Sequence, residues 1–264
     1  AWVLWNFSFV DMSAYPNLTK ASLPHLKNLY ENWCAGSGIG FSKYYSPKDA
    51  DDTAIAFYLL SRTGYTLPIN DILHFEREEH FCTFDYEAHS SISTNVHVLF
   101  ALVEDGFDCS HAKIQKILHF MREERIDNRY WIDKWHTSPY YVTSHAIISL
   151  VDLNPQLAED SVNWILETQK THGGWGHQST TAEETAYCLQ ALLVWKKHGH
   201  EVPETILNKG LDWLIQNMHH PYPPLWMAKC LYSPTLVVRS TIMSVLMLAK
   251  ELGVTHENSL EYAI

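Results

Sequence analysis

The sequence is poor in cysteine, in long apolar runs and in positive charge. Its five cysteines are scattered and never form a Cys-x-x-Cys pair, which argues against a disulfide framework and predicts a reducing, cytoplasmic location. The apolar runs are too short or too polar to cross a bilayer, and no signal peptide opens the chain, so no transmembrane segment is expected. The chain has 19 basic and 30 acidic residues, and the resulting net charge of −11 argues against nucleic acid as a partner.

Strand signals are also sparse, whereas apolar residues recur at helical spacing along most of the 264 residues. Glycines follow four of these runs and predict helix ends, at Gly64, Gly106, Gly199 and Gly253. Candidate N-cap residues precede the runs, namely Ser46, Ser93 or Thr94, Ser110, Thr143 or Ser144, Thr181 and Ser240. The pattern predicts an all-α fold.

Aromatic-bearing connectors interrupt the helices at residues 81–84, 130–131, 173–176 and 224–226. They recur roughly every 44 to 51 residues, a period that fits a helix pair plus a loop. Arrays of helix pairs either open into a solenoid or close into a ring. Residues 1–45 are the least regular, so we expect an irregular N-terminal segment there and a helical domain over 46–264. The chain begins with Ala1 rather than Met, which suggests a longer parent protein.

Three carboxylates, Asp49, Asp51 and Asp52, precede an apolar helical stretch. Ser46 and Pro47 suit the start of that helix, and a solvated, acidic first turn is the ordinary interpretation. Carboxylates packed this closely cannot all ionise, and a poorly hydrated environment strengthens the effect. A carboxylic acid that keeps its proton in an apolar cavity can protonate an alkene, and aromatic faces can shield the resulting carbocation. The spacing does not fit an Asp-Asp-x-x-Asp magnesium motif, and we predict no metal ligands in this chain.

The acidic block at residues 49–54 resembles the Asp-x-Asp-Asp block of class II terpene cyclases, and most closely that of copalyl-diphosphate-synthase-like diterpene cyclases. Further blocks of similarity follow in order at residues 93–99, 133–141, 181–187 and 224–232. Trp164, Gln169, Gly173 and Trp175 resemble the Gln/Trp repeat of the related triterpene cyclases. The resemblance covers roughly residues 40 to 250, and several blocks together are more specific than any one alone.

The resemblance implies an α/α barrel of helix pairs, called the β domain in this family, and an upstream γ domain that is missing from these residues. It implies an intramolecular cyclisation (isomerase) started by a proton, acting on a linear isoprenoid diphosphate whose diphosphate is retained. Geranylgeranyl diphosphate is the first expectation and farnesyl diphosphate the second. Mg²⁺ is implied as a cofactor by the resemblance alone.

The resemblance also implies roles for single residues. Asp51 would be the general acid, Asp49 and Asp52 would tune and orient it, Asn95 would hydrogen-bond it, and Lys134 would contact the diphosphate. Further candidates for substrate contact are Tyr44, Tyr45, Trp135, Tyr141, Trp175, Trp226, Lys229 and Arg239.

Several of these residues also have an ordinary structural interpretation. Connector aromatics usually pack repeats together, and Lys134 beside Asp133 could be a surface ion pair. His97 and His136 are more typical of satisfied polar residues than of catalytic bases, and Glu183 and Glu184 suit the capping of a helix.

Two other functions stay open. The chain could be a non-catalytic α/α helical domain, or a fragment that needs a missing γ domain. It could also be a subunit like those of protein prenyltransferases, but no zinc site of Asp, Cys and His appears at a suitable spacing.

Overall fold

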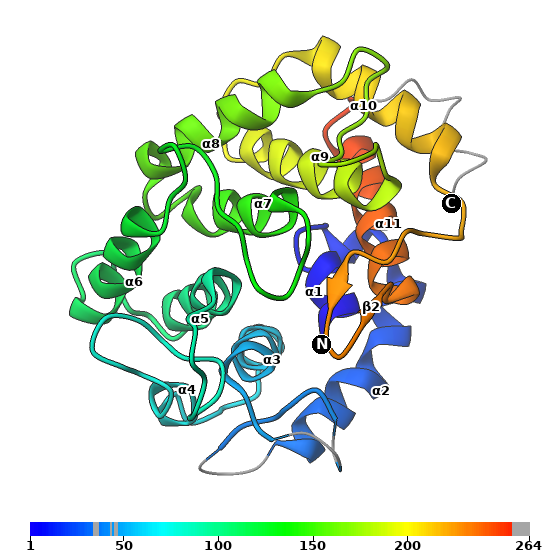
Figure 1. Cartoon of the computed structure of the whole chain (residues 1–264). Helices are drawn as coiled ribbons and strands as arrows, with labels where there is room; N and C mark the ends of the chain where they lie inside the picture. The colour runs from blue at the N-terminus through cyan, green and yellow to red at the C-terminus, as the bar shows by residue number, and fades with distance from the viewer. Residues whose placement is uncertain (34–36, 43, 45–46, 255–264) are drawn as a thin grey trace. The chain divides into compact units, whose positions relative to one another are not determined.

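The structure is a computed structural model that describes residues 1–33, 37–42, 44 and 47–254. The chain forms two compact units, and each is described by itself. Unit 1 consists of Ala1–Ser8 and Met12–Glu124, and unit 2 consists of Phe9–Asp11 and Arg125–Ile264. Both units are built from helices (Figure 1).

Unit 1 is built around two helices that are buried on nearly every side, α3 (Ala50–Arg62) and α5 (Ile92–Glu104), which pack against each other. Helix α6 (Ala112–Glu123) covers α5 with one apolar face, as its spacing of Ile114, Ile117, Leu118 and Met121 predicts. The remaining elements of the unit are α1 (Trp2–Phe7), the 3₁₀ helix η1 (Met12–Ala14), α2 (Pro16–Asn32) and α4 (Asn70–Leu73).

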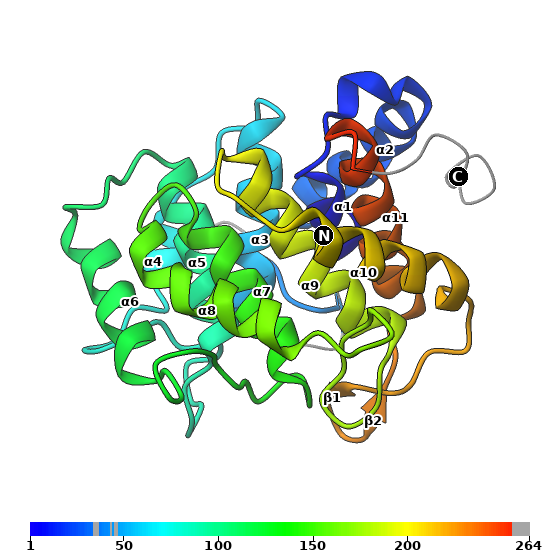
Figure 2. The same cartoon turned by 90° about the horizontal axis from the view of Figure 1, so that it is seen from above.

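Unit 2 repeats this division into inner and outer helices. The inner helix α9 (Ala182–Lys197) lies between α7 (Pro139–Leu150) and α11 (Thr235–Glu251), as Figures 1 and 2 show. The amphipathic helices α8 (Pro155–Thr168) and α10 (Glu204–Asn217) cover α7 and α9. A short antiparallel hairpin, β1 (Trp226–Met227) and β2 (Leu231–Tyr232), precedes α11. The all-α prediction is confirmed.

The predicted helix ends agree with the structure better than the predicted helix starts. Helices end just before Gly64, Gly106, Gly199 and Gly253, all with positive φ. Among the predicted N-caps, Thr181 is confirmed. The caps of α5, α6, α7 and α11 are instead Ser91, His111, Ser138 and Pro234, so those predictions are wrong. Most of these starts were missed because helical apolar periodicity becomes visible only after the first turn.

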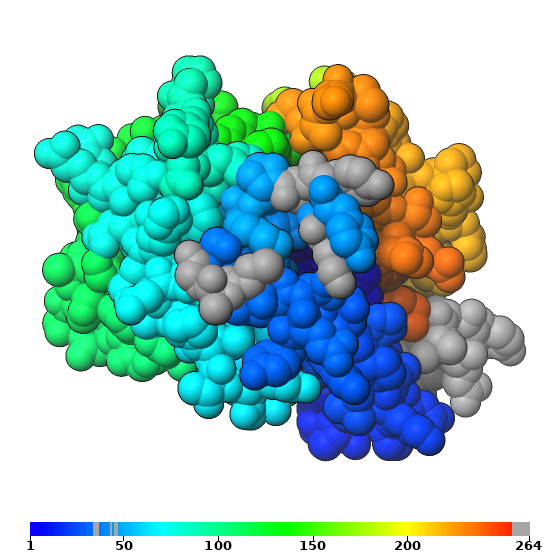
Figure 3. Space-filling model, turned by 90° about the horizontal axis from the view of Figure 1, so that it is seen from below, coloured from blue at the N-terminus to red at the C-terminus, as the bar shows by residue number. Residues whose placement is uncertain are grey.

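The expectation of an irregular segment over residues 1–45 is wrong for much of its length. Helix α2 is 17 residues long, begins with Pro16 in its first turn and contains Pro24 in its interior. Only Ser22 and Leu26 of this helix are buried, and Figure 3 shows the blue N-terminal part of the chain on the surface. A helix with so little buried surface has weak periodicity, which explains why the sequence pattern did not reveal it. Among the described residues, no helix is long and apolar enough to cross a membrane.

Candidate active site

Asp49 is the N-cap of α3, so the helix begins at Ala50 and not after Ser46, which lies outside the described residues. The carboxylate of Asp49 accepts the backbone N–H of Asp52 at 2.7 Å. The Asp49 N–H donates to the carbonyl of Ile39, and the Ala50 N–H donates to that of Thr83. These bonds fix the first turn of α3, and with it the backbone of Asp51 and Asp52.

Asp51 is paired with a buried histidine. Its Oδ1 atom lies 2.6 Å from Nδ1 of His97 on α5. The His97 side chain is fully buried, whereas the Asp51 side chain is 15% exposed. Asp51 is thus the most accessible of the three carboxylates and the one with a titratable partner.

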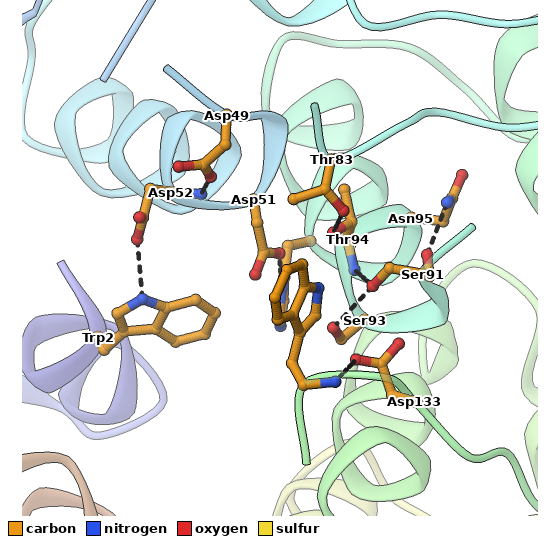
Figure 4. A network of polar contacts seen from close by, with 12 residues as sticks. Trp2, Asp49, Asp51, Asp52, Thr83, Ser91, Ser93, Thr94, Asn95 and Asp133 are labelled. Atoms are coloured by element: carbon orange, nitrogen blue, oxygen red, sulfur yellow. Dashed lines mark hydrogen bonds and ion pairs between the residues drawn. The ribbon is translucent and has the colours of Figure 1, made fainter. Parts of the chain in front are cut away.

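Asp52 points away from Asp51 and toward α1. Its Oδ1 atom accepts the indole N–H of Trp2 at 2.9 Å, and the two side chains face each other in Figure 4. Burial, followed by the charge of Asp51, raises the pKa of Asp52 from 3.8 to about 6. Burial, followed by the charge of Asp52, also raises the pKa of Asp49 well above its usual value. The cluster therefore retains protons at a pH where ordinary carboxyl groups are ionised.

Asn95 does not hydrogen-bond the acid, and this expectation is corrected. Its Oδ1 accepts the Phe81 N–H at 2.8 Å, and its Nδ2 donates to the carbonyls of Phe81 and Ser91 at 2.9 and 2.8 Å. Figure 4 shows Asn95 directed to Ser91. Residues two apart on a helix point in different directions, so His97 faces Asp51 and Asn95 cannot. Asn95 instead holds the connector that accepts the Ala50 N–H, and so supports the start of α3.

His97 is the site residue whose importance the sequence analysis missed. Its ring packs edge-on against Trp2 and Trp5, with centroid distances of 4.9 and 5.6 Å. The sequence did contain an indication of this role, because His97 is a titratable residue within an otherwise apolar run from Val96 to Leu99. Such a residue in a buried helix requires a polar partner.

Unit 2 holds the candidates for diphosphate contact. The Nζ atom of Lys134 lies 5.1 Å from the ring centroid of Trp135. Residues 135–137 pair antiparallel with 225–227 through the bonds Met227 N–H to Trp135 O and Thr137 N–H to Leu225 O, both 2.8 Å. This pairing brings Lys134 to the end of the hairpin whose turn carries the exposed Lys229. Arg239 is exposed on α11.

The remaining aromatic candidates differ in their positions. Tyr44 is 75% exposed in unit 1, and Tyr45 lies outside the described residues. Tyr141 and Trp175 are buried in the core of unit 2. The Trp175 N–H donates to the Ile165 carbonyl at 2.7 Å, and its ring lies against Gly210, so packing accounts for this residue.

The two adjacent glutamates of α9 have different roles. Glu184 supports the start of α9. Its backbone N–H donates to the hydroxyl of the N-cap Thr181, its Oε2 accepts that hydroxyl, and its Oε1 accepts the His177 N–H. Glu183 does not cap the helix, contrary to expectation. Its Oε1 accepts bonds from His136, Tyr187 and Trp226.

Within the described residues, no group of three or more His, Cys, Asp or Glu side chains could hold a metal ion. The carboxylates of Asp49 and Asp52 are engaged by N–H donors, as described above. These residues do not fit a magnesium site.

Comparison with known proteins identifies the family. Residues 81–222 match the model of the squalene-hopene cyclase C-terminal domain. A type B diterpene cyclase of Mycobacterium tuberculosis is 39% identical over 95% of this chain and 51% of its own length. An ent-copalyl diphosphate synthase of a Streptomyces strain is 31% identical over 78% of this chain and 42% of its own.

Solved structures agree with the sequence matches. The ent-copalyl diphosphate synthase of Streptomyces platensis has 30% identity and a TM-score of 0.76 over 85% of this chain and 46% of its own. The type II terpene cyclase MstE of Scytonema, at 14% identity, shares the fold with a TM-score of 0.73 over 95% of this chain and 87% of its own. The chain therefore belongs to the class II terpene cyclases, in the family of the squalene-hopene cyclase C-terminal domain. It spans about half the length of the curated relatives it matches.

Proposed function

We propose that this chain carries the acid site of a class II diterpene cyclase and that Asp51 protonates the terminal alkene of a linear isoprenoid diphosphate. The observation that carries the proposal is the 2.6 Å contact between Asp51 and the buried His97, beside two further carboxylates with raised pKa values. A surface helix start would need neither a buried histidine nor buried carboxylates.

The proposed step moves one proton. The Asp51 O–H bond breaks, and the alkene electron pair forms a C–H bond at the CH carbon of the terminal alkene. A tertiary carbocation at the dimethyl carbon and an Asp51 carboxylate result. His97 suits this step when its Nδ1–H donates to Oδ1, because that bond stabilises the carboxylate left behind. The proton to be transferred then sits on Oδ2. The cation closes rings by attack of internal alkenes, and a final loss of a proton gives a cyclic diphosphate.

The names of the relatives support a C20 substrate, since they include a diterpene cyclase and a copalyl diphosphate synthase. We propose geranylgeranyl diphosphate first and farnesyl diphosphate second. Lys134 is the proposed diphosphate contact, with Lys229 as a second cation on the neighbouring hairpin. Mg²⁺ on the diphosphate rests on the resemblance alone.

The test is an incubation with geranylgeranyl diphosphate, followed by removal of phosphate and analysis for a cyclic alcohol. Because the chain spans half the length of its relatives, the assay includes both these 264 residues and any longer protein that contains them. A cyclic product that is absent in Asp51→Asn supports the proposal. A product that persists in Asp51→Asn contradicts it.

The alternative is a non-catalytic α/α helical domain. This alternative predicts no cyclic product, either from these 264 residues or from a longer protein that contains them. It also predicts that Asp51→Asn does not change the affinity for an isoprenoid. The burial of His97 against Asp51 favours the cyclase, because a domain that only packs has no need for an accessible acid.

A further inference from the structure

The connector that precedes α5 is bound to that helix by a two-bond contact that recurs in unit 2. The Oδ1 and Nδ2 atoms of Asn95 pair with the N–H and the carbonyl of Phe81, as described above. On α9, the hydroxyl of Thr185 likewise accepts the N–H of Trp175 at 2.9 Å and donates to its carbonyl at 3.2 Å. This contact satisfies the buried backbone of a connector and ties it to the inner helix that follows. It accounts for Asn95 as a part of the scaffold.

A second set of bonds in the same connector centres on Thr83 and goes beyond the two-bond contact. The Oγ1 atoms of Thr83 and Thr94 lie 2.8 Å apart (Figure 4), and both residues are buried. The Thr83 N–H donates to Oε1 of Glu87 at 2.8 Å. The Thr83 carbonyl accepts the Ala50 N–H at 3.0 Å. Thr83 is thus held at its side chain and its N–H, and it presents its carbonyl to the first residue of α3.

These bonds form a closed path around Asp51. Ala50 directly precedes Asp51 in the sequence, and its N–H bond to Thr83 continues to α5 through the hydroxyl of Thr94. His97 lies one turn further along α5, and the path closes at its 2.6 Å contact with Asp51. The first N–H groups of a helix have no partner within the helix, and unsupported helix ends fray. Because Ala50 is 0% exposed, water cannot take the place of the Thr83 carbonyl.

We infer that Thr94 is a positioning residue for the acid step. Through Thr83 it sets the position of the first turn of α3 against α5, and so the distance from Asp51 to His97. Thr94 is 0% exposed, so it does not contact the substrate. That Asp51 is the acid rests on the proposed function, but the effect of Thr94 on the contact with His97 does not. The alternative is that the two threonines only satisfy each other's hydroxyl groups.

The first measurement needs no turnover. The ¹⁵N chemical shift of His97 Nδ1 responds to the hydrogen bond with Asp51, and Asp51→Ala gives the value without that bond. Thr94→Val removes the hydroxyl and keeps the shape, so it should move the shift toward the Asp51→Ala value. Thr94→Ser keeps the hydroxyl and should retain the wild-type value. Thr185→Val is the matched control, because it breaks the two-bond contact on α9 and should leave the shift unchanged.

The second measurement is the rate of cyclisation. Thr94→Val should lower kcat about tenfold and leave KM unchanged, because a displaced acid slows proton transfer without changing substrate contacts. Thr94→Ser should restore kcat. If Thr94→Val does not fold, Glu87→Ala decides, since it removes the acceptor of the Thr83 N–H at a partly exposed loop position. It should change the Nδ1 shift and kcat in the same directions.

The double variant Thr83→Val with Thr94→Val tests the alternative. It leaves neither hydroxyl buried without a partner, so the alternative predicts the wild-type Nδ1 shift and kcat for it. The inference predicts the values of Thr94→Val instead. A wild-type shift or kcat in the folded Thr94→Val protein, or an equal change of shift in Thr185→Val, would overturn the inference.

The two measurements also separate this inference from the proposed function. A changed Nδ1 shift in Thr94→Val without a cyclic product from any form of the protein contradicts the proposed function alone. A cyclic product that Thr94→Val forms at the wild-type rate contradicts the inference alone.

Discussion

The Nδ1 atom of His97 lies 2.6 Å from Oδ1 of Asp51, although 46 residues separate the two in the sequence. The contact joins the first turn of α3 to the middle of α5, the two inner helices of unit 1. It gives the accessible carboxylate of the cluster a fixed, buried partner.

His97→Gln should lower the cyclisation rate by about 100-fold, because the carboxylate formed on Asp51 loses its donor. Substrate affinity should change little, since His97 is fully buried. Steady-state kinetics of the purified variant measure both effects. His25→Gln, at an exposed position on α2, is the control, and an unchanged rate in His97→Gln would rule out the assigned role.

Asp52→Asn should stabilise the protein above pH 6. The folded-state pKa of Asp52 is raised from 3.8 to about 6, so the folded protein holds this proton more tightly than the unfolded chain. Stability from this group is complete below pH 4 and is lost as the pH rises to about 6. The difference corresponds to a cost of about 3 kcal/mol above that window. Asparagine removes the charge and can still accept the Trp2 N–H.

The measurement for this prediction is denaturant unfolding of wild type and Asp52→Asn from pH 4 to pH 8. The stability of the wild type should fall across this range more steeply than that of the variant. Asp212→Asn, an exposed carboxyl group on α10, should behave like wild type. Parallel profiles for wild type and Asp52→Asn would contradict the raised pKa.

Trp2→Phe should raise the pKa of Asp52 further. The indole N–H donates to the carboxylate at 2.9 Å and favours its charged form, so its loss should shift the pKa upward by roughly one unit. The pH at which stability levels off should move upward accordingly. Trp33→Phe is a matched control, because Trp33 donates its N–H to Asp71 instead. If the pKa of Asp52 shifted equally in Trp2→Phe and Trp33→Phe, the cause would be a general loosening of the fold and not the loss of the Trp2 hydrogen bond.

Glu184→Ala should destabilise the protein by about 1–2 kcal/mol, since the variant leaves the Thr181 hydroxyl and the His177 N–H without their acceptor. Glu184→Gln keeps an acceptor oxygen and should lose less than half as much. Thermal unfolding followed by circular dichroism distinguishes the two. Equal losses would show that the charge of Glu184 matters more than its bonds.

The sequence predicted features that depend on local patterns. Helix ends at glycines such as Gly64 follow from the positive φ that the chain needs there, and Thr181 with Glu184 is a capping pattern of four residues. The family resemblance is likewise a linear pattern, and the comparisons confirm it.

Features that depend on contacts distant in sequence could not be predicted. Whether Asn95 or His97 reaches Asp51 depends on which face of α5 is turned toward α3, and that is set by packing between segments distant in sequence. Trp2 reaches Asp52 across 50 residues of chain. Glu183 looked like a capping residue because the next residue, Glu184, is one, and only the packing of His136, Tyr187 and Trp226 reveals its position.

The central claim, that Asp51 delivers the initiating proton, is tested most directly by deuterium incorporation. Geranylgeranyl diphosphate is cyclised in D₂O, and the product is examined by mass spectrometry and NMR. We predict one deuterium in the ring methylene group that derives from the CH carbon of the terminal alkene, and a loss of product of about 1,000-fold in Asp51→Asn but none in Asp212→Asn. A cyclic product without deuterium at that methylene group, or one formed at the wild-type rate by Asp51→Asn, would contradict the assignment.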